Sequence, residues 1–431
     1  MKGGPALALA LAAVVGALGP RPAAAKELEI KAVGGEGQLR RIFAPRNTLE
    51  AVLVLRFGTG YADEASLRGG TLVSKHALLS MQKRVKYADL LEALHGATPG
   101  LTTSIGPHQT TFTLRAHRDE LMEAAELLVT AALSPTFDAP AFPAALERAM
   151  VDGTPRSPLD ELLARLSLHT FVSDVRYRPE VEVERLETVT WPSVKRHLEE
   201  AFSPANATAI VAGGFNPAAM EALLSRHSGG ERHSPRLPKL ALPVSHRFQA
   251  RDEAHLFYFP LDLGAPEKVA AARVLAELLE DRVGQRLRRL PSSFPVEVRL
   301  LSQGSFKGIA VSLPEHAGVG VDLSAHVRLE VQAFREGRAT AEQLAAAKAG
   351  AVRRFQRVDA TPALLAEEIL AGLEAEGWLG AEVLSALEKV EPRQMVEVLG
   401  PQLAQEKSVH LFFSPEVSPS DATAFTSEVP K

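Results

Sequence analysis

Apolar positions recur along the chain with two periods, and they recur in the same order in both halves of the sequence. Short runs that are alternately or continuously apolar predict strands, whereas apolar residues spaced three and four apart predict helices. In the first half these patterns predict strands at 50–58 and 110–116, a helix at 118–134, and a helix at 192–202 that leads into a strand at 207–215. In the second half they predict strands at 253–261 and 306–314, helices at 266–290 and 320–337, and a closing helix and strand at 393–403 and 408–415.

The repeated order predicts an α+β fold of two similar tandem α/β domains. In each domain we expect an antiparallel-rich sheet with helices packed on one face, because a sheet must bury its apolar face. Residues 225–246 are rich in Gly, Ser, Pro and basic residues, which predicts an inter-domain linker. We therefore assign an N-terminal domain to 26–224, a C-terminal domain to 247–415 and a tail to 416–431.

Residues 1–25 have the pattern of a secretory signal peptide. Lys2 precedes an apolar run, and Pro20, Pro22 and an Ala-Ala-Ala ending at Ala25 follow it. We expect cleavage after Ala25 and export to the periplasm or the medium. The alternative is an uncleaved membrane anchor, but the run is shorter than the ~20 residues that a span needs. The remaining sequence has no comparable apolar stretch, so we expect no membrane span after cleavage.

The composition excludes several kinds of chemistry. The 431 residues contain no cysteine, which excludes disulfides, thiol catalysis, iron–sulfur clusters and cysteine-ligated zinc. Lys and Arg number 48 against 52 Asp and Glu, so the charge balance does not favour a nucleic acid or an anionic membrane as a partner. His227, His233 and His246 lie in the linker, where we expect them to be solvated rather than to bind a metal.

Four segments, taken in order, resemble one family. Residues 54–70 ("VLRFGTGYADEASLRGG") combine a strand, a glycine turn and acidic residues before a helix that begins at a glycine. Residues 95–138 predict a glycine-bounded edge strand, a threonine-rich strand and a long helix; 183–215 predict a helix before a closing strand, and 270–290 a helix containing Leu-Arg. Over residues 30–415 this order resembles the pitrilysin/insulinase-type zinc peptidases, which include mitochondrial-processing-peptidase subunits and two-domain bacterial relatives. The resemblance implies half of a peptidase clamshell.

The resemblance also implies where a zinc site would lie. Active members carry His-x-x-Glu-His on the helix after the glycine, so that two His hold zinc and the Glu takes a proton from zinc-bound water. With Gly70 on the family glycine, Val73 and Ala77 occupy the two ligand positions and His76 the general-base position. We therefore predict no catalytic or metal-binding residue here and interpret His76 as a helix residue on a partly buried surface.

The third family ligand, a downstream Glu, should fall near residues 152–155. The chain offers Asp152 there, followed by Gly153 and, two residues later, Pro155. Gly and Pro cost about 1 and about 3 kcal/mol relative to Ala inside a helix, so we expect the supporting helix to break at this point. No cofactor is expected; zinc is the cofactor only under the alternative of an active enzyme.

Two substrate contacts follow from the resemblance. Arg288 matches the family arginine that contacts the substrate, while Phe294 stands where a tyrosine would stabilise the oxyanion and lacks its hydroxyl. The segment 100–106 ("GLTTSIG"), with Thr102, Thr103 and Ser104, matches the edge strand to which a substrate peptide adds. The alternatives are a surface arginine within a basic run and a simple surface hairpin.

The sequence thus favours an exported, catalytically inactive homologue of this peptidase family. Its role would be that of a non-catalytic partner subunit, or a peptide-binding scaffold, for an active zinc-containing homologue. Two alternatives stay open: an active zinc metalloendopeptidase with an unconventional site, and a stand-alone periplasmic homodimer that binds peptides. The peptide ligand and the partner are not determined by the sequence.

Overall fold

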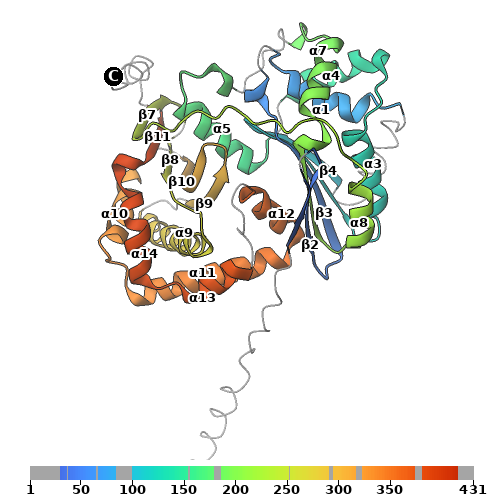
Figure 1. The fold of residues 1–431 in the computed structure, drawn as a ribbon. Helices are drawn as coiled ribbons and strands as arrows, with labels where there is room; N and C mark the ends of the chain where they lie inside the picture. Colours follow the sequence, from blue (N-terminus) through green and yellow to red (C-terminus); the bar gives the residue numbers. More distant parts are fainter. Residues whose placement is uncertain are drawn as a thin grey trace, which may run out of the picture.

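Two α/β halves lie side by side in the structure, a computed structural model, and each half contains one sheet (Figure 1). The structure describes residues 30–35, 37–64, 67–83, 100–153, 156–178, 186–251, 253–290, 295–316, 323–373 and 381–415. The predicted signal peptide and C-terminal tail lie outside the described residues. Among the described residues, no helix is long and apolar enough to cross a membrane.

The first half is built on a six-stranded sheet of order β1-β2-β6-β3-β5-β4, in which only β2 and β6 pair parallel. Its strands are β1 Lys31–Val33, β2 Arg40–Pro45, β3 Glu50–Phe57, β4 Gly100–Ile105, β5 Thr110–His117 and β6 Ala207–Gly213. Its α-helices are α1 Gly70–Ser80, α3 Leu121–Leu133, α4 Phe142–Asp152, α5 Pro158–Thr170, α7 Trp191–Ala201 and α8 Pro217–Leu224. The predicted strands and helices of this half are confirmed to within a few residues.

The second half repeats the plan with a five-stranded sheet of order β7-β11-β8-β10-β9, in which only β7 and β11 pair parallel. Its strands are β7 Val244–Gln249, β8 Glu253–Pro260, β9 Glu297–Gln303, β10 Phe306–His316 and β11 Val409–Ser414. Its helices are α9 Pro266–Leu287, α10 Leu323–Arg335, α11 Ala341–Ala360, α12 Pro362–Ala371, α13 Ala381–Lys389 and α14 Pro392–Leu399. The predicted α+β class with antiparallel-rich sheets is confirmed.

The outer face of the first sheet is covered by helices of its own half. Because side chains alternate along a strand, Leu53, Leu55 and Phe57 point to this face and pack with the apolar faces of α1, α3, α7 and α8. In the second sheet, Phe257 and Phe259 point in the same way toward α9. Helices of each half therefore lie on one face of its sheet, as predicted.

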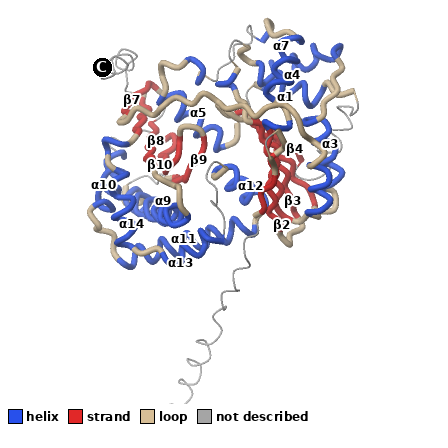
Figure 2. Tube along the Cα trace, viewed as in Figure 1, coloured by secondary structure: helices blue, strands red, loops and turns tan. Residues whose placement is uncertain are grey.

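The opposite face of each sheet is covered by a helix from the other half, which the sequence pattern did not indicate. Helix α12 of the second half packs on β3 and β6, in one core cluster with Val52, Val54 and Ile210. Helix α5 of the first half packs against β7 and β11, and its Leu163 and Leu166 join the core under the second sheet. Figure 2 shows both helices in the space between the two sheets. The two halves therefore exchange one helix each.

The segment 225–246, predicted as a linker, is held against both halves over much of its length. The His233 amide donates to Asn206 Oδ1 at 2.9 Å, and Ser305 Oγ donates to the Pro238 carbonyl at 2.8 Å. His227 Nδ1 lies 2.9 Å from Ser134 Oγ, and β7 begins at Val244, so His246 lies in a strand. The three histidines are partly exposed, as expected for solvated residues, but the segment also makes tertiary contacts at each of them.

Candidate functional site

Helix α1, which carries the positions of the family zinc motif, is buried along most of its length. Val73 and Ala77 are both 0% exposed and contribute to the core of the first half. The helix begins directly after Gly69, whose φ of 85° lies in the left-handed region that favours glycine. The Glu64 carboxylate accepts hydrogen bonds from the amides of Gly69 at 2.7 Å and Thr71 at 2.9 Å. This acidic residue caps the helix N-terminus.

Burial of Glu64 raises the pKa of its carboxyl group to about 7, although the two amide bonds act in the opposite direction. The Glu64 carboxylate therefore lies in a buried environment that disfavours its charge, and the two amide hydrogen bonds partly offset this effect. This capping role explains, on structural grounds, why an acidic residue precedes the helix.

His76, at the general-base position, lies within the contact between α1 and α4. It is 5% exposed, more buried than the partly buried surface position that we predicted, because the end of α4 covers it. Its Nε2 lies 3.3 Å from Asp152 Oδ2, and the buried Lys75 Nζ lies 4.0 Å from the same oxygen. Helix α4 ends at Asp152, and Gly153 follows at a φ of 59°, which confirms the predicted end of the helix.

The electrostatics of this cluster oppose a metal cation. Burial, and next the charge of Lys75, lower the pKa of His76 to about 4, so its ring is neutral at pH 7. Burial lowers the pKa of Lys75 to about 8, with the Asp152 carboxylate acting against this shift, so the amine is still mostly protonated at pH 7. A buried ammonium group next to the helix therefore supplies positive charge where a zinc site would need electron-pair donors.

The side chains present do not fit zinc. The two ligand positions carry the aliphatic residues Val73 and Ala77, which leaves His76 and Asp152 as the only candidate donors among the motif positions. Within the described residues no group of three or more His, Asp or Glu is placed to hold a metal ion. We derive no metal-assisted step for this chain.

The inner face of the first sheet, toward the second half, is divided into an apolar and a polar part. The paired residues across strands β2, β6, β3, β5 and β4 form three rows: Arg40, Thr208, Arg56, Thr111, Ser104; Ile42, Ile210, Val54, Thr113, Thr102; and Ala44, Ala212, Val52, Arg115, Gly100. The apolar positions of the second and third rows lie in the core cluster that includes α12. The residues of the first row are polar. In every row, the last two residues, which lie on β5 and β4, are polar or glycine.

The polar columns at β5 and β4 face a cavity of about 660 Å³ between the two halves. Thr102, Thr103 and Ser104, the predicted docking residues, all line it. Strand β4 is at the edge of the sheet, so its outer backbone groups are not paired with another strand of this sheet. The structure therefore brings these three residues to a sheet edge beside an open volume.

The facing wall of this cavity comes from α9, β9, α11 and α12. Ion pairs between helices stiffen it: Arg273 Nη2 lies 3.1 Å from Glu368 Oε2, and Arg354 Nη2 lies 2.9 Å from Glu280 Oε2. The cavity thus has a threonine-rich wall from one half and a charged wall from the other.

Arg288, the predicted arginine contact, lies directly after α9 and is not among the residues that line this cavity. Its side chain is 61% exposed, and its Nη2 is 3.9 Å from Asp281 Oδ1. Phe294 lies outside the described residues. The structure therefore brings Thr102, Thr103 and Ser104 together but does not place Arg288 among the residues that line their cavity.

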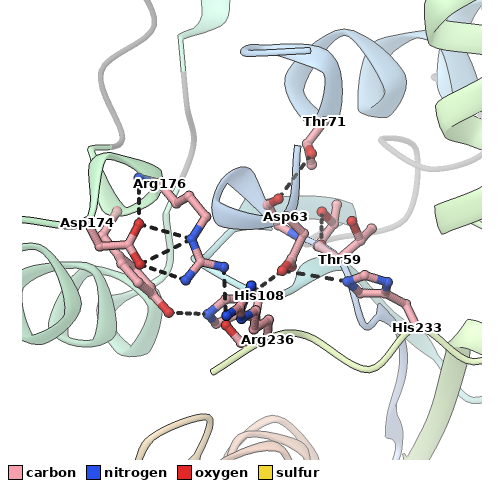
Figure 3. Close-up of polar contacts among 11 residues, drawn as sticks. Thr59, Asp63, Thr71, His108, Asp174, Arg176, His233 and Arg236 are labelled. Atoms are coloured by element: carbon pink, nitrogen blue, oxygen red, sulfur yellow. Dashed lines mark hydrogen bonds and ion pairs between the residues drawn. The ribbon is translucent and has the colours of Figure 1, made fainter. Parts of the chain in front are cut away.

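A buried polar network, which the sequence reasoning missed, connects the start of α1 to the segment 225–246 (Figure 3). The Asp63 carboxylate lies 2.8 Å from His108 Nδ1, and His108 Nε2 lies 2.7 Å from the Tyr177 hydroxyl. His233 Nε2 is 3.7 Å from the same carboxylate, and Arg176 donates to the Arg236 carbonyl at 3.2 Å. Asp63 is adjacent to the capping Glu64, so the short acidic pair "DE" before the helix was the available signal.

The geometry of this network accommodates a His108 ring that donates from Nδ1 and accepts at Nε2. If the ionised Asp63 accepts from Nδ1–H of His108, then Nε2 is left as the acceptor for the Tyr177 hydroxyl. Burial raises the pKa of Tyr177 above its ordinary value, so the hydroxyl remains a donor at neutral pH. The polar groups of this network therefore have hydrogen-bond partners, and the network joins the region before helix α1 to the segment 225–246.

Comparison with solved structures identifies the fold as that of M16-type peptidase domains. The chain superposes on the M16 inactive domain from Pseudomonas fluorescens with a TM-score of 0.69 at 14% identity, covering 91% of this chain and 99% of that one. It superposes on the first half of the periplasmic protease PqqL from Escherichia coli with a TM-score of 0.67 at 12% identity, covering 94% and 97%. A protease from Helicobacter pylori gives a TM-score of 0.67 at 15% identity, covering 90% and 100%.

The whole PqqL chain is matched over 50% of its length, so this chain corresponds in extent to one half of that molecule. No protein-family model matches the chain, and its sequence matches no curated protein. The likeness therefore lies in the fold, at 12–15% sequence identity in these comparisons.

Proposed function

We propose that the chain is a non-catalytic member of the pitrilysin/insulinase-type (M16) peptidase family that binds extended peptides. It would act as a partner subunit or scaffold for an active zinc-containing homologue. The observation that carries the proposal is the contrast between the two parts of the family site. The zinc positions hold Val73, His76 and Ala77, with Lys75 paired to Asp152, whereas the β4 edge remains polar and faces a cavity.

Strand addition at β4 is the binding mode that this geometry favours. A peptide that pairs with the outer edge of β4 gains backbone hydrogen bonds, which do not depend on its sequence. The side chains of Thr102 and Ser104 point to the inner face, and the cavity beside them gives alternate peptide side chains room. Affinity would therefore come from the backbone, and selectivity from the charged wall opposite.

The extent of the fold supports a partner. The chain corresponds to half of the whole PqqL, so a complete clamshell would need a second chain, either a zinc-containing homologue or a second copy. Export is supported by the N-terminal signal pattern of residues 1–25 and by the description of PqqL as periplasmic.

Two proline variants test peptide docking. Thr102→Pro and Thr103→Pro remove amide protons that point to opposite sides of β4, because successive amides alternate along a strand. One faces β5 and the other faces the free edge. In fluorescence anisotropy with labelled denatured casein, we expect the variant at the free edge to lose binding at least tenfold while its circular dichroism is unchanged. Equal binding by both folded variants would rule out strand addition at β4.

Metal analysis and hydrolysis test the non-catalytic role. We expect purified protein, dialysed against buffer containing trace zinc, to retain far less than one zinc per chain and to leave a quenched fluorescent peptide uncut. Stoichiometric zinc with hydrolysis would instead establish the active metalloendopeptidase. Co-purification with a homologue that carries His-x-x-Glu-His supports the partner role, whereas a homodimer that binds casein alone supports the scaffold role.

A further inference from the structure

A second cavity, of about 170 Å³, lies where the two halves and the segment 225–246 meet. Its walls come from the ends of β3 and β6, the β4–β5 turn, α5, the β9–β10 turn and the segment 225–246. A cavity of about 150 Å³ holds a molecule the size of benzene, so this one can hold a phosphate or a carboxylate of a few carbons.

The lining of this cavity is one-sided in charge. It includes Arg56, Arg232, His108 and His233, while none of the described residues that line it is Asp or Glu. Asp63 lies behind the two histidines, is 3% exposed at its side chain, and does not line the cavity. Asp160 also lies behind the lining, where it accepts a hydrogen bond from Gln109 Nε2, so the acidic groups surround the cavity and the arginines are the charged groups that line it.

The register of the sheet concentrates arginines at this position. Thr208 on β6 pairs with Arg40 on β2 on one side and with Arg56 on β3 on the other, so all three point to the inner face. Arg232 approaches from the segment 225–246, where its Nε donates to the Ala205 carbonyl at 3.2 Å. Burial, and next the charge of Arg40, lower the pKa of Arg232 from its ordinary value.

Two hydroxyl groups in the lining are not used as hydrogen-bond donors within the described residues. Arg56 uses its Nε on Gln109 Oε1 at 2.9 Å, a neutral acceptor. The hydroxyls of Thr208 and Ser167, by contrast, have no hydrogen-bond partner in the part of the chain that the structure describes. Two guanidinium groups with adjacent hydroxyls form the donor set that proteins use to bind oxyanions.

We propose that the chain binds a small oxyanion, a phosphate or a carboxylate, in the cavity between Arg56, Arg232 and Thr208. The anion would connect the first half to the segment 225–246 and would neutralise the clustered arginines. This site is separate from the β4 edge and does not depend on peptide binding there.

Isothermal titration calorimetry of the full mature chain tests the proposal, with inorganic phosphate and with malonate as separate probes. Ionic strength is held constant with sodium chloride, because non-specific binding to surface charge falls with salt. We expect saturable binding of at least one probe. Phosphate alone indicates a site for a tetrahedral oxyanion, malonate alone a site for a carboxylate, and both together a general oxyanion site.

Arg232→Gln should weaken binding at least tenfold, and Thr208→Val several-fold, without loss of the circular dichroism signal. Arg236→Gln is the matched control, since Arg236 is another exposed arginine of the same segment and does not line the cavity. Absence of saturable heat with both probes would overturn the proposal, as would equal loss in the control. Should Arg232→Gln fail to fold, unchanged binding by Thr208→Val would count against the site.

Discussion

The α1–α4 contact and the β4 edge belong to the same half of the chain, but they differ in character. The first is a packed contact with apolar residues, and the second is a polar strand edge beside a cavity. At the α1–α4 contact, aliphatic residues occupy the two ligand positions, and the buried Lys75 and His76 lie beside the half-exposed Asp152. At the β4 edge, the exposed Thr102 and the buried Ser104 form a polar face beside a large cavity. Within one half, the motif positions of α1 thus belong to the core, whereas the β4 edge lies beside a cavity.

The largest expected effect tests whether the two regions depend on each other. A Cβ atom at Gly60 would lie 2.2 Å from the Gly106 carbonyl oxygen and 2.6 Å from the Gln109 amide nitrogen, both backbone atoms. Gly60→Ala should therefore cost more than about 3 kcal/mol of unfolding free energy and displace the β4–β5 turn from the start of α1. Urea unfolding measures this cost.

Gly35→Ala is the control for Gly60→Ala, because the nearest atom to its added Cβ would be 3.9 Å away. We expect that variant to change the unfolding free energy by less than about 0.5 kcal/mol. Similar values for the two variants would show that the close approach at Gly60 relaxes easily.

The next effect is a pH dependence that belongs to the α1–α4 contact alone. The folded-state pKa of His76 is lowered to about 4 from an ordinary 6.5, so the unfolded chain binds this proton first as pH falls. The stabilisation from the neutral His76 ring is present above pH 6.5 and is lost as pH falls toward 4, by about 3 kcal/mol. Lys75, Asp152 and Arg148 all act on this ring, so the measurement must compare variants.

His76→Gln should remove that part of the dependence when urea unfolding is measured between pH 7 and pH 4.5. The comparison with the unaltered protein is needed because Glu64 acts with the opposite sign. Its folded-state pKa is raised to about 7, so stability from this group falls as pH rises from about 4.5 to 7. A difference between the two proteins that does not change with pH would contradict the assignment to His76.

The smallest effect concerns the ion pair itself. Asp152→Asn removes the carboxylate beside the buried Lys75 and should destabilise the protein by about 1 kcal/mol, because Asp152 is half exposed and the contact is long. Lys75→Met replaces the ammonium group with an apolar chain of similar volume and should be neutral or stabilising. A loss of several kcal/mol in Lys75→Met would mean that the ammonium group is required for the fold.

Much of the fold could be predicted from the sequence because its elements carry clear periods. The run 50–58 alternates between two buried faces, and 266–290 keeps its apolar residues at helical spacing, so both were found within a few residues of their ends. Gly153 likewise indicated the end of α4 from the local sequence alone, because glycine is unfavourable inside a helix.

The parts that were missed depend on contacts between distant segments. The side-chain period of α5 and α12 shows that they are amphipathic or apolar, but not that each packs on the sheet of the other half. The row of Arg40, Thr208 and Arg56 requires the strand order and the register, which no single segment contains. The burial of His76 and Lys75 likewise comes from α4, about 75 residues later in the chain.

The exchange of α5 and α12 between the halves has a consequence for how this chain can be divided. A fragment that ends before residue 225 would leave Val52, Val54 and Ile210 uncovered, because α12 would be missing. A fragment that begins after it would lose α5 and expose the opposite face of the second sheet. Although the sequence shows the same plan twice, the two halves share their apolar cores, so we expect neither half to fold stably as a separate fragment.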